Sequence, residues 1–172
     1  MSYRSDAPSE FDERVVQVSR VSKKTKGGNN IGFSVLMVVG DKKGRVGVGL
    51  GKAPDVVSSI QKGIKKAKKR LIRVPLKGNT IPFSLEHKFG AAKILLKPAP
   101  KGSGVIAGGP VRAVVEVAGI QDIVSKIQGS DNPASNVYAT FRALKEMSLI
   151  AKQKGIKLED RDKKGEGAEN ET

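Results

Sequence analysis

The chain has no cysteine and no tryptophan, and it contains a single histidine. Without cysteine it can form neither a disulfide framework nor a thiolate metal site, which is typical of a reducing compartment. It also contains no apolar run near the ~20 residues that a membrane-spanning helix needs. The first 14 residues include acids and lack the apolar segment of a secretory signal. We therefore expect a cytoplasmic protein with no membrane partner.

Acidic residues are scarce relative to basic ones. The 172 residues include 32 Lys and Arg against 17 Asp and Glu, a formal net charge of +15. Residues 1–14 and 157–172 each carry a net charge of −2, so residues 15–156 hold 26 basic and 7 acidic residues, a net charge of +19. A folded body with this charge repels itself, and phosphates are the usual partner that offsets the repulsion.

Aromatic residues are also few, with five Phe and two Tyr. Proteins that bind single strands stack bases on aromatic side chains. We therefore expect nucleic acid to be recognised through phosphate, ribose and shape, with little reading of bases.

Side chains in a catalytic arrangement are lacking as well. The single histidine, His87, lies beside Glu86 and is predicted to be structural or exposed. The sequence has no defensible Ser/His/Asp set, no cysteine nucleophile and no metal-ligand spacing. It therefore predicts no catalytic residue, no metal, no cofactor and no small-molecule substrate.

The pattern along the first half predicts one small domain. Residues 1–14 are expected to be a flexible acidic arm. Residues 15–21, 31–39 and 45–50 have the apolar patterning of strands, with a cationic loop at 22–30 and a tight turn at 40–44. Pro54 and Asp55 begin a helix with apolar residues at spacings of three and four. Residues 15–73 thus predict three antiparallel strands on one helix.

The second half predicts an α/β domain, and the fold class of the whole chain is α+β. Residues 74–80 are expected to be a linker between the domains. Within 81–151 we expect strands at 81–88, 91–97 and 122–127, a glycine-rich loop at 98–109 and a helix from Pro110. Asn132 and Pro133 are typical of the start of another helix. Residues 152–172 are expected to form a charged, disordered tail.

The predicted first helix carries most of the clustered charge. Six cations occur among the nine residues 62–70 with no acid between them, whereas a solvated helix would intersperse Glu. Glycine occupies every second position from 47 to 51 in the strand before it. That spacing fits neither a P-loop nor a dinucleotide fingerprint. Two interpretations stay open: the strand packs closely on the helix, or its backbone approaches a phosphate chain.

A second glycine cluster, Gly102, Ser103 and Gly104, precedes the helix that begins at Pro110. Unpaired N–H groups in such a loop suit an anion, and Lys101 and Arg112 would add donors. A small-molecule kinase could use this loop, but the only acids within 81–130 are Glu86, Glu116 and Asp122, none in a convincing pair. We expect an RNA backbone or a protein neighbour there instead.

Two long motifs carry a resemblance. The motifs GRVGVGLGKAPDV, followed by the lysine-rich helix, and KILLKPAPKGSGVIAGGPVRAVVEVAGIQDIVSKIQGSDNP closely resemble the bacterial small-subunit ribosomal protein five family. The similarity runs from about residue 15 to 151. It implies a domain similar to double-stranded-RNA-binding domains, then a two-layer α/β domain with a βαβ crossover of unusual left hand, whereas the common rule predicts a right hand.

The resemblance also implies a function. Members of the family are structural constituents of the small ribosomal subunit that bind its ribosomal RNA and support subunit assembly, translational accuracy and messenger unwinding at the entry channel. The implied partners are small-subunit ribosomal RNA, ribosomal proteins four and eight, and messenger RNA. The main alternative is a free-standing double-stranded-RNA binder or RNA chaperone, and a phosphate-loop enzyme is the second.

Some site residues come from the family motifs: the loop 22–28, Gly51 with Lys52, and the glycine loop 102–109. The family commonly has Arg and an aromatic after the Gly-Gly pair, where this chain has Asn29, Asn30 and Ile31, and a basic residue where it has Tyr138. The residues predicted to bind RNA are Arg20, Ser22, Lys23, Lys24, Thr25, Lys26, Gly27, Gly28, Asn29, Lys42, Lys43, Arg45, Gly51, Lys52, Lys62, Lys65, Lys66, Lys68, Lys69, Arg70, Lys101, Gly102, Ser103, Gly104 and Arg112.

Overall fold

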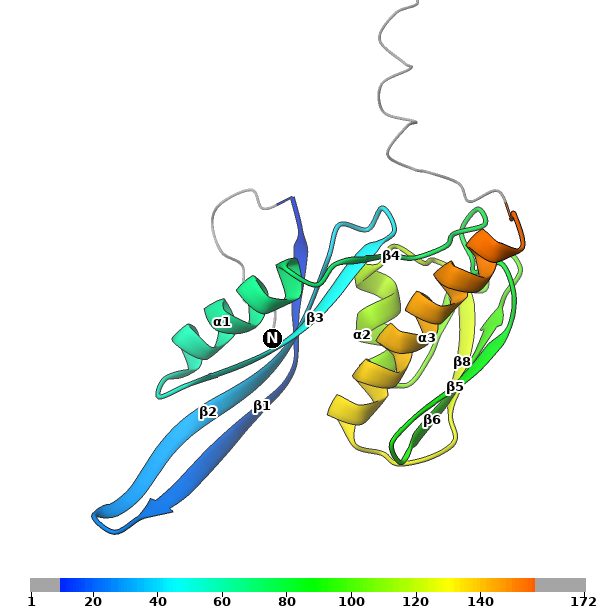
Figure 1. The fold of residues 1–172 in the computed structure, drawn as a ribbon. Coiled ribbons are helices and arrows are strands. Elements are labelled where there is room, and N and C mark those ends of the chain that lie inside the picture. Colours follow the sequence, from blue (N-terminus) through cyan, green and yellow to red (C-terminus); the bar gives the residue numbers. More distant parts are fainter. Residues whose placement is uncertain (1–9, 157–172) are drawn as a thin grey trace, which may run out of the picture.

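Two four-stranded sheets organise the protein, and the computed structural model describes residues 10–156 (Figure 1). The first sheet has the order β1-β2-β3-β4 and the second the order β5-β6-β8-β7. Helix α1 covers the first sheet, while α2 and α3 lie between that sheet and the second one (Figure 1). The predicted α+β class, with a helix-covered antiparallel sheet followed by an α/β unit, is confirmed.

The first sheet consists of β1 (Asp12–Thr25), β2 (Gly28–Gly40), β3 (Arg45–Ala53) and β4 (Ile72–Arg73), all antiparallel. Strand β3 pairs with β2 only as far as Phe33 and Ala53, because Pro54 follows and has no N–H for the ladder. The β1–β2 pairing continues beyond that point to Thr25 and Gly28. We call residues 21–32, which have no β3 beside them, the hairpin arm.

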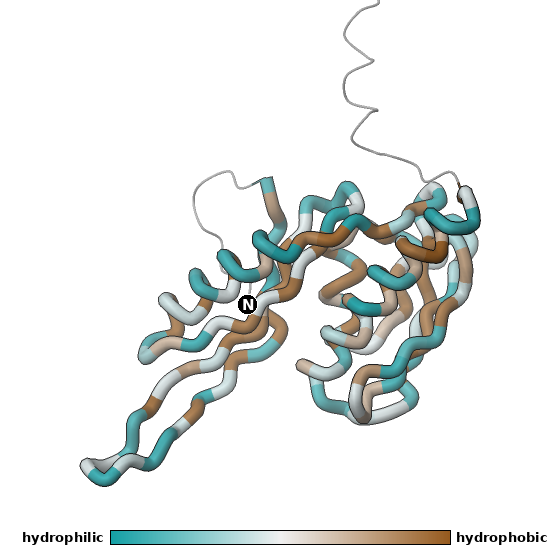
Figure 2. The backbone as a smooth tube through the Cα atoms, viewed as in Figure 1, coloured by the Kyte–Doolittle hydropathy of each residue, from teal (hydrophilic) through white to brown (hydrophobic). Residues whose placement is uncertain are grey.

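The hairpin arm leaves the body of the molecule as a two-stranded ribbon (Figure 1). All its side chains from residue 21 to 31 are exposed. Figure 2 shows a hydrophilic tip with apolar residues at intervals along the ribbon. Because both faces of the ribbon lie in solvent, neither face needs a continuous apolar row.

Helix α1 (Val56–Lys68) packs on β3 through glycine. Asp55 caps the helix by accepting a hydrogen bond from the Ser58 N–H at 2.8 Å. A Cβ atom at Gly47, Gly49 or Gly51 would lie only 2.3, 2.2 or 1.9 Å from the carbonyl oxygens of Ala67, Gly63 and Ser59, respectively. The contacts recur every two residues along β3, a distance of ~6.8 Å, and every four residues along α1, a distance of ~6.0 Å. Because these two distances are similar, all three glycines can contact the helix. This confirms the interpretation of close packing between strand and helix.

The second sheet consists of β5 (Leu85–Phe89), β6 (Ala92–Pro98), β7 (Val105–Ile106) and β8 (Ile123–Ile127). Helices α2 (Gly109–Val117) and α3 (Pro133–Gln153) cover its inner face. Strands β7 and β8 pair in parallel and are joined through α2, which gives a βαβ unit. Asn132 caps α3 by accepting from the Ala134 N–H at 3.0 Å, and Pro133 begins the helix, as the sequence predicts.

The two halves of the molecule share one hydrophobic core. The face of the first sheet opposite α1 carries four buried residues that are each at most 2% exposed: Leu36, Val38, Val46 and Val48. They belong to the same cluster as the apolar faces of α2 and α3 and the inner face of the second sheet. The second half of the chain therefore supplies the cover that the first sheet needs.

Several boundaries differ from the sequence predictions. Strand β1 already begins at Asp12, within the predicted arm 1–14, and α3 continues to Gln153, beyond the predicted domain end at 151. Strand β5 begins at Leu85 rather than at residue 81, and β7 lies in a segment predicted as loop. The rest of the predicted arm (1–9) and of the predicted tail (157–172) lies outside the described residues. No helix within residues 10–156 is long and apolar enough to cross a membrane.

Candidate nucleic-acid interface

The predicted cationic loop 22–30 is a hairpin rather than a loop, which corrects the sequence prediction. Strand pairing continues to Thr25 and Gly28 and leaves a two-residue turn at 26–27. The Thr25 hydroxyl donates to the Gly28 carbonyl oxygen at 2.8 Å and fixes the tip. The segment therefore presents its side chains from a rigid ladder.

The hairpin arm and its base hold four cations: Arg20, Lys23, Lys24 and Lys26. All four are exposed, and none has an ion-pair partner within residues 10–156. Ser22, Gly27 and Asn29 are exposed alongside them. Lys23 lies opposite Asn30 and Lys24 opposite Asn29. Because successive residues of a strand point to opposite faces, Lys23 and Lys24 place positive charge on both faces of the arm.

The cations of α1 and of the two residues after it, Lys69 and Arg70, divide into two groups. Lys68 is bound internally, since its Nζ lies 3.0 Å from a Glu13 carboxylate oxygen and 5.4 Å from the Phe11 ring centroid. The others are exposed and have no ion-pair partner in the described part of the chain; they are Lys62, Lys65, Lys66, Lys69 and Arg70. The C-terminal half of α1 and the residues just after it thus remain strongly positive.

A small groove of about 200 Å³ joins α1 to the second half of the molecule. It is lined by Gly49, Leu50, Lys52, Lys66, Arg70 and Tyr138. The Lys66 ammonium donates to the Leu50 carbonyl oxygen at 3.0 Å on the edge of β3. Tyr138 stacks at a tilt on Phe89, with ring centroids 5.9 Å apart. Lys52, Lys66 and Arg70 therefore converge beside Tyr138, the neutral residue that departs from the family pattern. The sequence does not predict this neighbourhood, because the tyrosine lies ~70 residues along the chain from the nearest of these cations.

Lys42, Lys43 and Arg45 occupy the turn between β2 and β3, and two of the three are engaged internally. Arg45 pairs with Asp41 at 2.6 Å and with Glu10 at 3.3 Å, and Lys42 pairs with Asp12 at 3.3 Å. Only Lys43 is exposed without a charged partner among residues 10–156. The prediction that all three neutralise RNA phosphates needs correction, since acids of the chain already neutralise two of them.

Asp41 holds this turn together. Burial by itself would raise the pKa of the Asp41 carboxyl, but hydrogen bonds from the Arg45 side chain and from the N–H groups of Arg45 and Lys43 lower it below its usual range. The turn then docks on the end of α2, where the Lys42 N–H donates to the Val117 carbonyl oxygen at 3.1 Å. Lys42 takes a left-handed backbone (φ 58°) in this turn.

Arg112 is likewise neutralised within the protein. Its Nε lies 2.6 Å from a Glu116 carboxylate oxygen, and Arg14 of β1 pairs with the other oxygen. Burial alone would raise the Glu116 pKa, but hydrogen bonds from Arg112 and Arg14 lower it. Arg112 is therefore not the predicted donor to an external anion. It belongs to an ion triad with Glu116 and Arg14 that joins α2 to the first sheet.

The predicted anion loop at 102–104 already contains its anion. The buried carboxylate of Asp122 accepts from the N–H of Gly102 at 3.0 Å and from the N–H of Gly104 at 2.9 Å. The Ser103 N–H donates to the Pro100 carbonyl oxygen at 3.2 Å. The three donors are thus occupied, which corrects the phosphate-cradle interpretation. Lys101 remains exposed at the rim of a hollow that Asp122 also lines.

Gly51, which the sequence predicts to contact RNA, is a packing residue in the structure. It is buried, and the space where its side chain would lie is filled by the Ser59 carbonyl oxygen. Its role is to admit α1 to the sheet. Its neighbour Lys52 points to the opposite face and is exposed, so the Gly-Lys pair divides into a packing residue and a surface cation.

His87 lies in β5 and is half-buried, and its Nδ1 is 2.7 Å from a Glu146 carboxylate oxygen of α3. Among residues 10–156 no group of three or more His, Asp or Glu side chains could hold a metal ion. The arrangement can therefore bind a ligand through its exposed cations and through the shape of its backbone.

Comparison with known proteins gives matches over nearly all the described chain. The family model described as ribosomal protein S5, N-terminal domain, matches residues 11–75, and the one described as ribosomal protein S5, C-terminal domain, matches residues 87–154. The small ribosomal subunit protein uS5 of Chloroflexus aurantiacus is 55% identical over 141 residues, which cover 82% of this chain and 79% of the relative.

Proposed function

Because this chain belongs to the ribosomal protein S5 family of the small ribosomal subunit, we propose that it is a structural component that binds small-subunit ribosomal RNA through the hairpin arm and the exposed cations of α1. The observation that carries the proposal is the set of exposed cations on these two elements without acidic partners in residues 10–156. Acids of the chain pair with Lys42, Arg45, Lys68 and Arg112, whereas the cations of these two surfaces remain for phosphates.

The shape of the arm supports this role. Five residue pairs beyond the end of β3 extend the ribbon by roughly 17 Å, at ~3.4 Å per residue. A narrow ribbon with cations on both faces can lie between two RNA helices and neutralise phosphates on each side. The α1 surface would then contact a neighbouring stretch of backbone.

The finer roles are proposals that rest on the family. We assign RNA binding chiefly to residues 15–73 and protein contacts to residues 81–151, joined by the linker 74–80. The proposed partners are ribosomal proteins four and eight and messenger RNA near the entry channel, and the proposed roles are assembly, decoding accuracy and messenger unwinding in the cytoplasmic ribosome.

We propose no enzymatic activity, since the family is one of structural ribosomal proteins and the loop considered for a kinase is closed by Asp122. The free-standing RNA binder remains the alternative. Sedimentation separates the two, because a subunit component should co-migrate with small subunits after a high-salt wash and a free-standing binder should not.

Binding of the purified full chain to small-subunit ribosomal RNA across a salt series tests the proposal. We expect a log–log slope of about −5 or steeper and an advantage of ~10-fold over unrelated duplex RNA. The double variant Lys24→Gln/Lys26→Gln should reduce the slope by about 2. The matched control is Lys145→Gln/Lys152→Gln, two exposed cations of α3, which should leave the slope unchanged. A shallow slope, or equal effects of both pairs, would contradict the proposed surface.

A further inference from the structure

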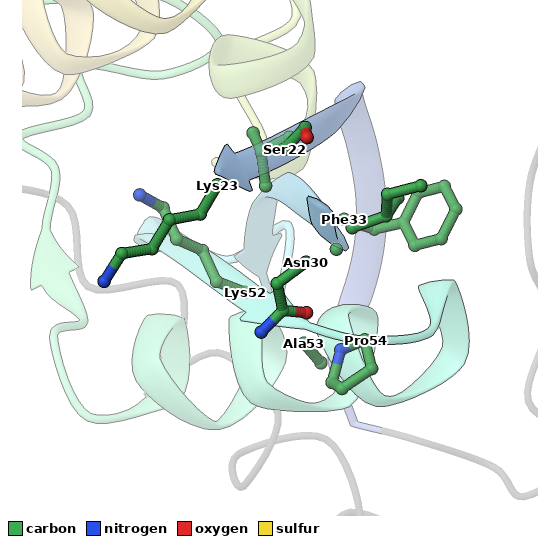
Figure 3. A pocket seen from close by; sticks show the side chains of 10 residues that line it. Ser22, Lys23, Asn30, Phe33, Lys52, Ala53 and Pro54 are labelled. Carbon is green, nitrogen blue, oxygen red and sulfur yellow. The ribbon is translucent and has the colours of Figure 1, made fainter. Parts of the chain in front are cut away.

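A hollow of about 350 Å³ lies at the base of the hairpin arm, where β3 leaves the sheet. Its lining is mainly apolar, unlike the cationic surface around it, and comprises Val21, Ser22, Lys23, Asn30, Ile31, Gly32, Phe33, Lys52, Ala53 and Pro54 (Figure 3). The volume falls within the ~300–1,000 Å³ typical of sites for small molecules or single residues.

The hollow lies where the local packing ends. Pro54 cannot continue the β2–β3 ladder, so the β2 edge beyond Phe33 has no strand beside it. At Gly32 the Ala53 carbonyl oxygen comes close to the β2 backbone, since a Cβ there would lie only 3.1 Å from that oxygen and 3.9 Å from Val21 Cγ2. Val21 and Ile31 are each 41% exposed beside this gap.

Polar groups stand at the rim in a defined order. The side chains of Lys23 and Lys52 run toward the same side of the hollow, the Asn30 amide lies between them and Pro54, and the Phe33 ring lies on the far side (Figure 3). Lys23 and Lys52 are exposed and have no ion-pair partner in the described residues. The Asn30 amide offers one acceptor and two donors. Asn30 and Ile31, two of the residues that depart from the family pattern, line this hollow.

We propose that the hollow receives one unpaired base of the bound RNA, with the flanking phosphates held by Lys23 and Lys52. The inference deepens the proposed function and rests on it. The register of β1 and β2 places Val21 on the face of the ribbon that carries Lys23 and Asn30, and Ile31 and Phe33 on the other face, so the hollow runs round the free edge of β2. The apolar side chains on its two sides exclude water from the base, and the Asn30 amide hydrogen-bonds the polar edge of the base. A paired base could not enter, because its edge is engaged in the duplex. This revises the expectation that recognition involves little reading of bases.

An RNA nucleotide fits these observations better than a protein segment does. An apolar side chain could fill the walls, but it would leave two lysines and a carboxamide at the rim without partners. A nucleotide carries the flat apolar face, the polar edge and the anions in one unit. Charge complementarity therefore favours RNA as the occupant.

The test uses the full chain and three RNA hairpins that differ at one position: a bulged adenosine, an abasic nucleotide at the same place, and a fully paired stem. The abasic RNA keeps the ribose and phosphate, so comparison with it isolates the base. We expect the bulged adenosine to bind ~10-fold tighter than the abasic RNA. Ile31→Ser and Val21→Ser should each remove most of that preference while preserving the salt slope. Val18→Ser is the matched control, since Val18 is 48% exposed on β1 but does not line the hollow.

The lysines provide a second readout. Lys23→Gln and Lys52→Gln should each weaken binding of adenosine and abasic RNAs alike and reduce the salt slope by about 1. Equal binding of the two RNAs by the wild-type chain, with a steep slope, would overturn the base site and leave the proposed function intact. A preference that survives both Ile31→Ser and Val21→Ser, or that Val18→Ser also removes, would overturn it too. Failure to bind any RNA would overturn the base site and the proposed function together.

Discussion

At the scale of single residues, Asp122 determines the chemistry of the loop at 102–104. Glycine-rich sequence before a helix suits a phosphate when its N–H groups are unoccupied. Here the Asp122 carboxylate accepts from two of those N–H groups at 2.9 and 3.0 Å. The loop is therefore an anion site whose ligand belongs to the same chain.

Replacing this carboxylate should destabilise the protein. In Asp122→Ala the N–H groups of Gly102 and Gly104 would lose a charged acceptor, so we expect the free energy of unfolding to fall by about 2–4 kcal/mol. Urea unfolding followed by circular dichroism measures the change. Asp131→Ala, at an exposed aspartate, is the control and should change stability by less than about 0.5 kcal/mol. Equal effects of the two substitutions would show that the loop does not depend on Asp122.

Asp41 gives the protein a contribution to stability that depends on pH. Its pKa in the folded protein lies below the usual aspartate value of 3.8, because Arg45 and two backbone N–H groups donate to the ionised form despite burial. The contribution is therefore present above pH ~4 and is lost as pH falls through the folded pKa. We expect Asp41→Asn to be less stable than wild type at pH 7, with a difference that shrinks below pH ~4. Unfolding free energies measured from pH 7 to pH 2.5 check this, and a difference independent of pH would contradict it.

Residue-level features were predictable where the partners are neighbours in sequence. The caps of α1 and α3 follow from Asp55 and from Asn132 with Pro133, because a cap is made within one turn. The pairs of Lys42 with Asp12 and of Arg14 with Glu116 join distant segments, which only folding brings together. The Arg112–Glu116 pair, by contrast, spans four residues of α2 and is local. Counting charges along the chain cannot separate these engaged cations from unpaired ones.

At the scale of elements, the contact between β3 and α1 depends on the absence of side chains. Adding one methyl group at Gly49 would place a carbon 2.2 Å from the Gly63 carbonyl oxygen, well inside contact distance. We expect Gly49→Ala to lower the free energy of unfolding by about 3 kcal/mol or more, because helix and sheet would have to separate. Chemical denaturation measures this.

Gly27→Ala is the matched control for that substitution. No heavy atom lies within 4 Å of a Cβ built at Gly27, and its φ is not positive, so the change should be close to neutral. If Gly49→Ala proved as mild as Gly27→Ala, the close packing would not be a source of stability.

The hairpin arm shows why one element was misassigned from sequence. Strands are recognised by alternation of apolar and polar residues, which arises when one face is buried. Between residues 21 and 31 both faces are exposed, so the sequence there shows turn residues and lysines instead. By contrast, α2 was predictable, because its buried residues Val111, Val114 and Val115 follow the helical period.

At the scale of the whole molecule, the shared core makes the two halves depend on each other. Leu36, Val38, Val46 and Val48 are covered by elements of the second half. Exposing four such side chains costs roughly 6–12 kcal/mol, at ~1.5–3 kcal/mol each. This is comparable to the total stability of ~5–15 kcal/mol for a typical domain.

We therefore expect residues 1–80, prepared alone, to show no cooperative unfolding transition. The full chain should unfold in a single step, with a calorimetric enthalpy equal to the van't Hoff enthalpy. Scanning calorimetry of both proteins provides the measurement. Two separate transitions in the full chain, or a cooperative transition in the fragment, would mean that each half is stable by itself. Units of about 70 residues bury little core and often need a partner, but the sequence does not identify the surface that provides it.

The contacts between β3 and α1 recur at matching distances along the two elements, and this match also restricts how the segment can change in length. Substitutions on the outer face of α1 alter one contact at a time. An insertion of one residue into β3 would instead turn side chains toward the helix at each following position. An insertion into α1 would rotate Ser59, Gly63 or Ala67 by about 100° relative to one another. Residues 47–67 should therefore accept exchanges of residue type on the outer face of α1 during evolution and reject insertions and deletions.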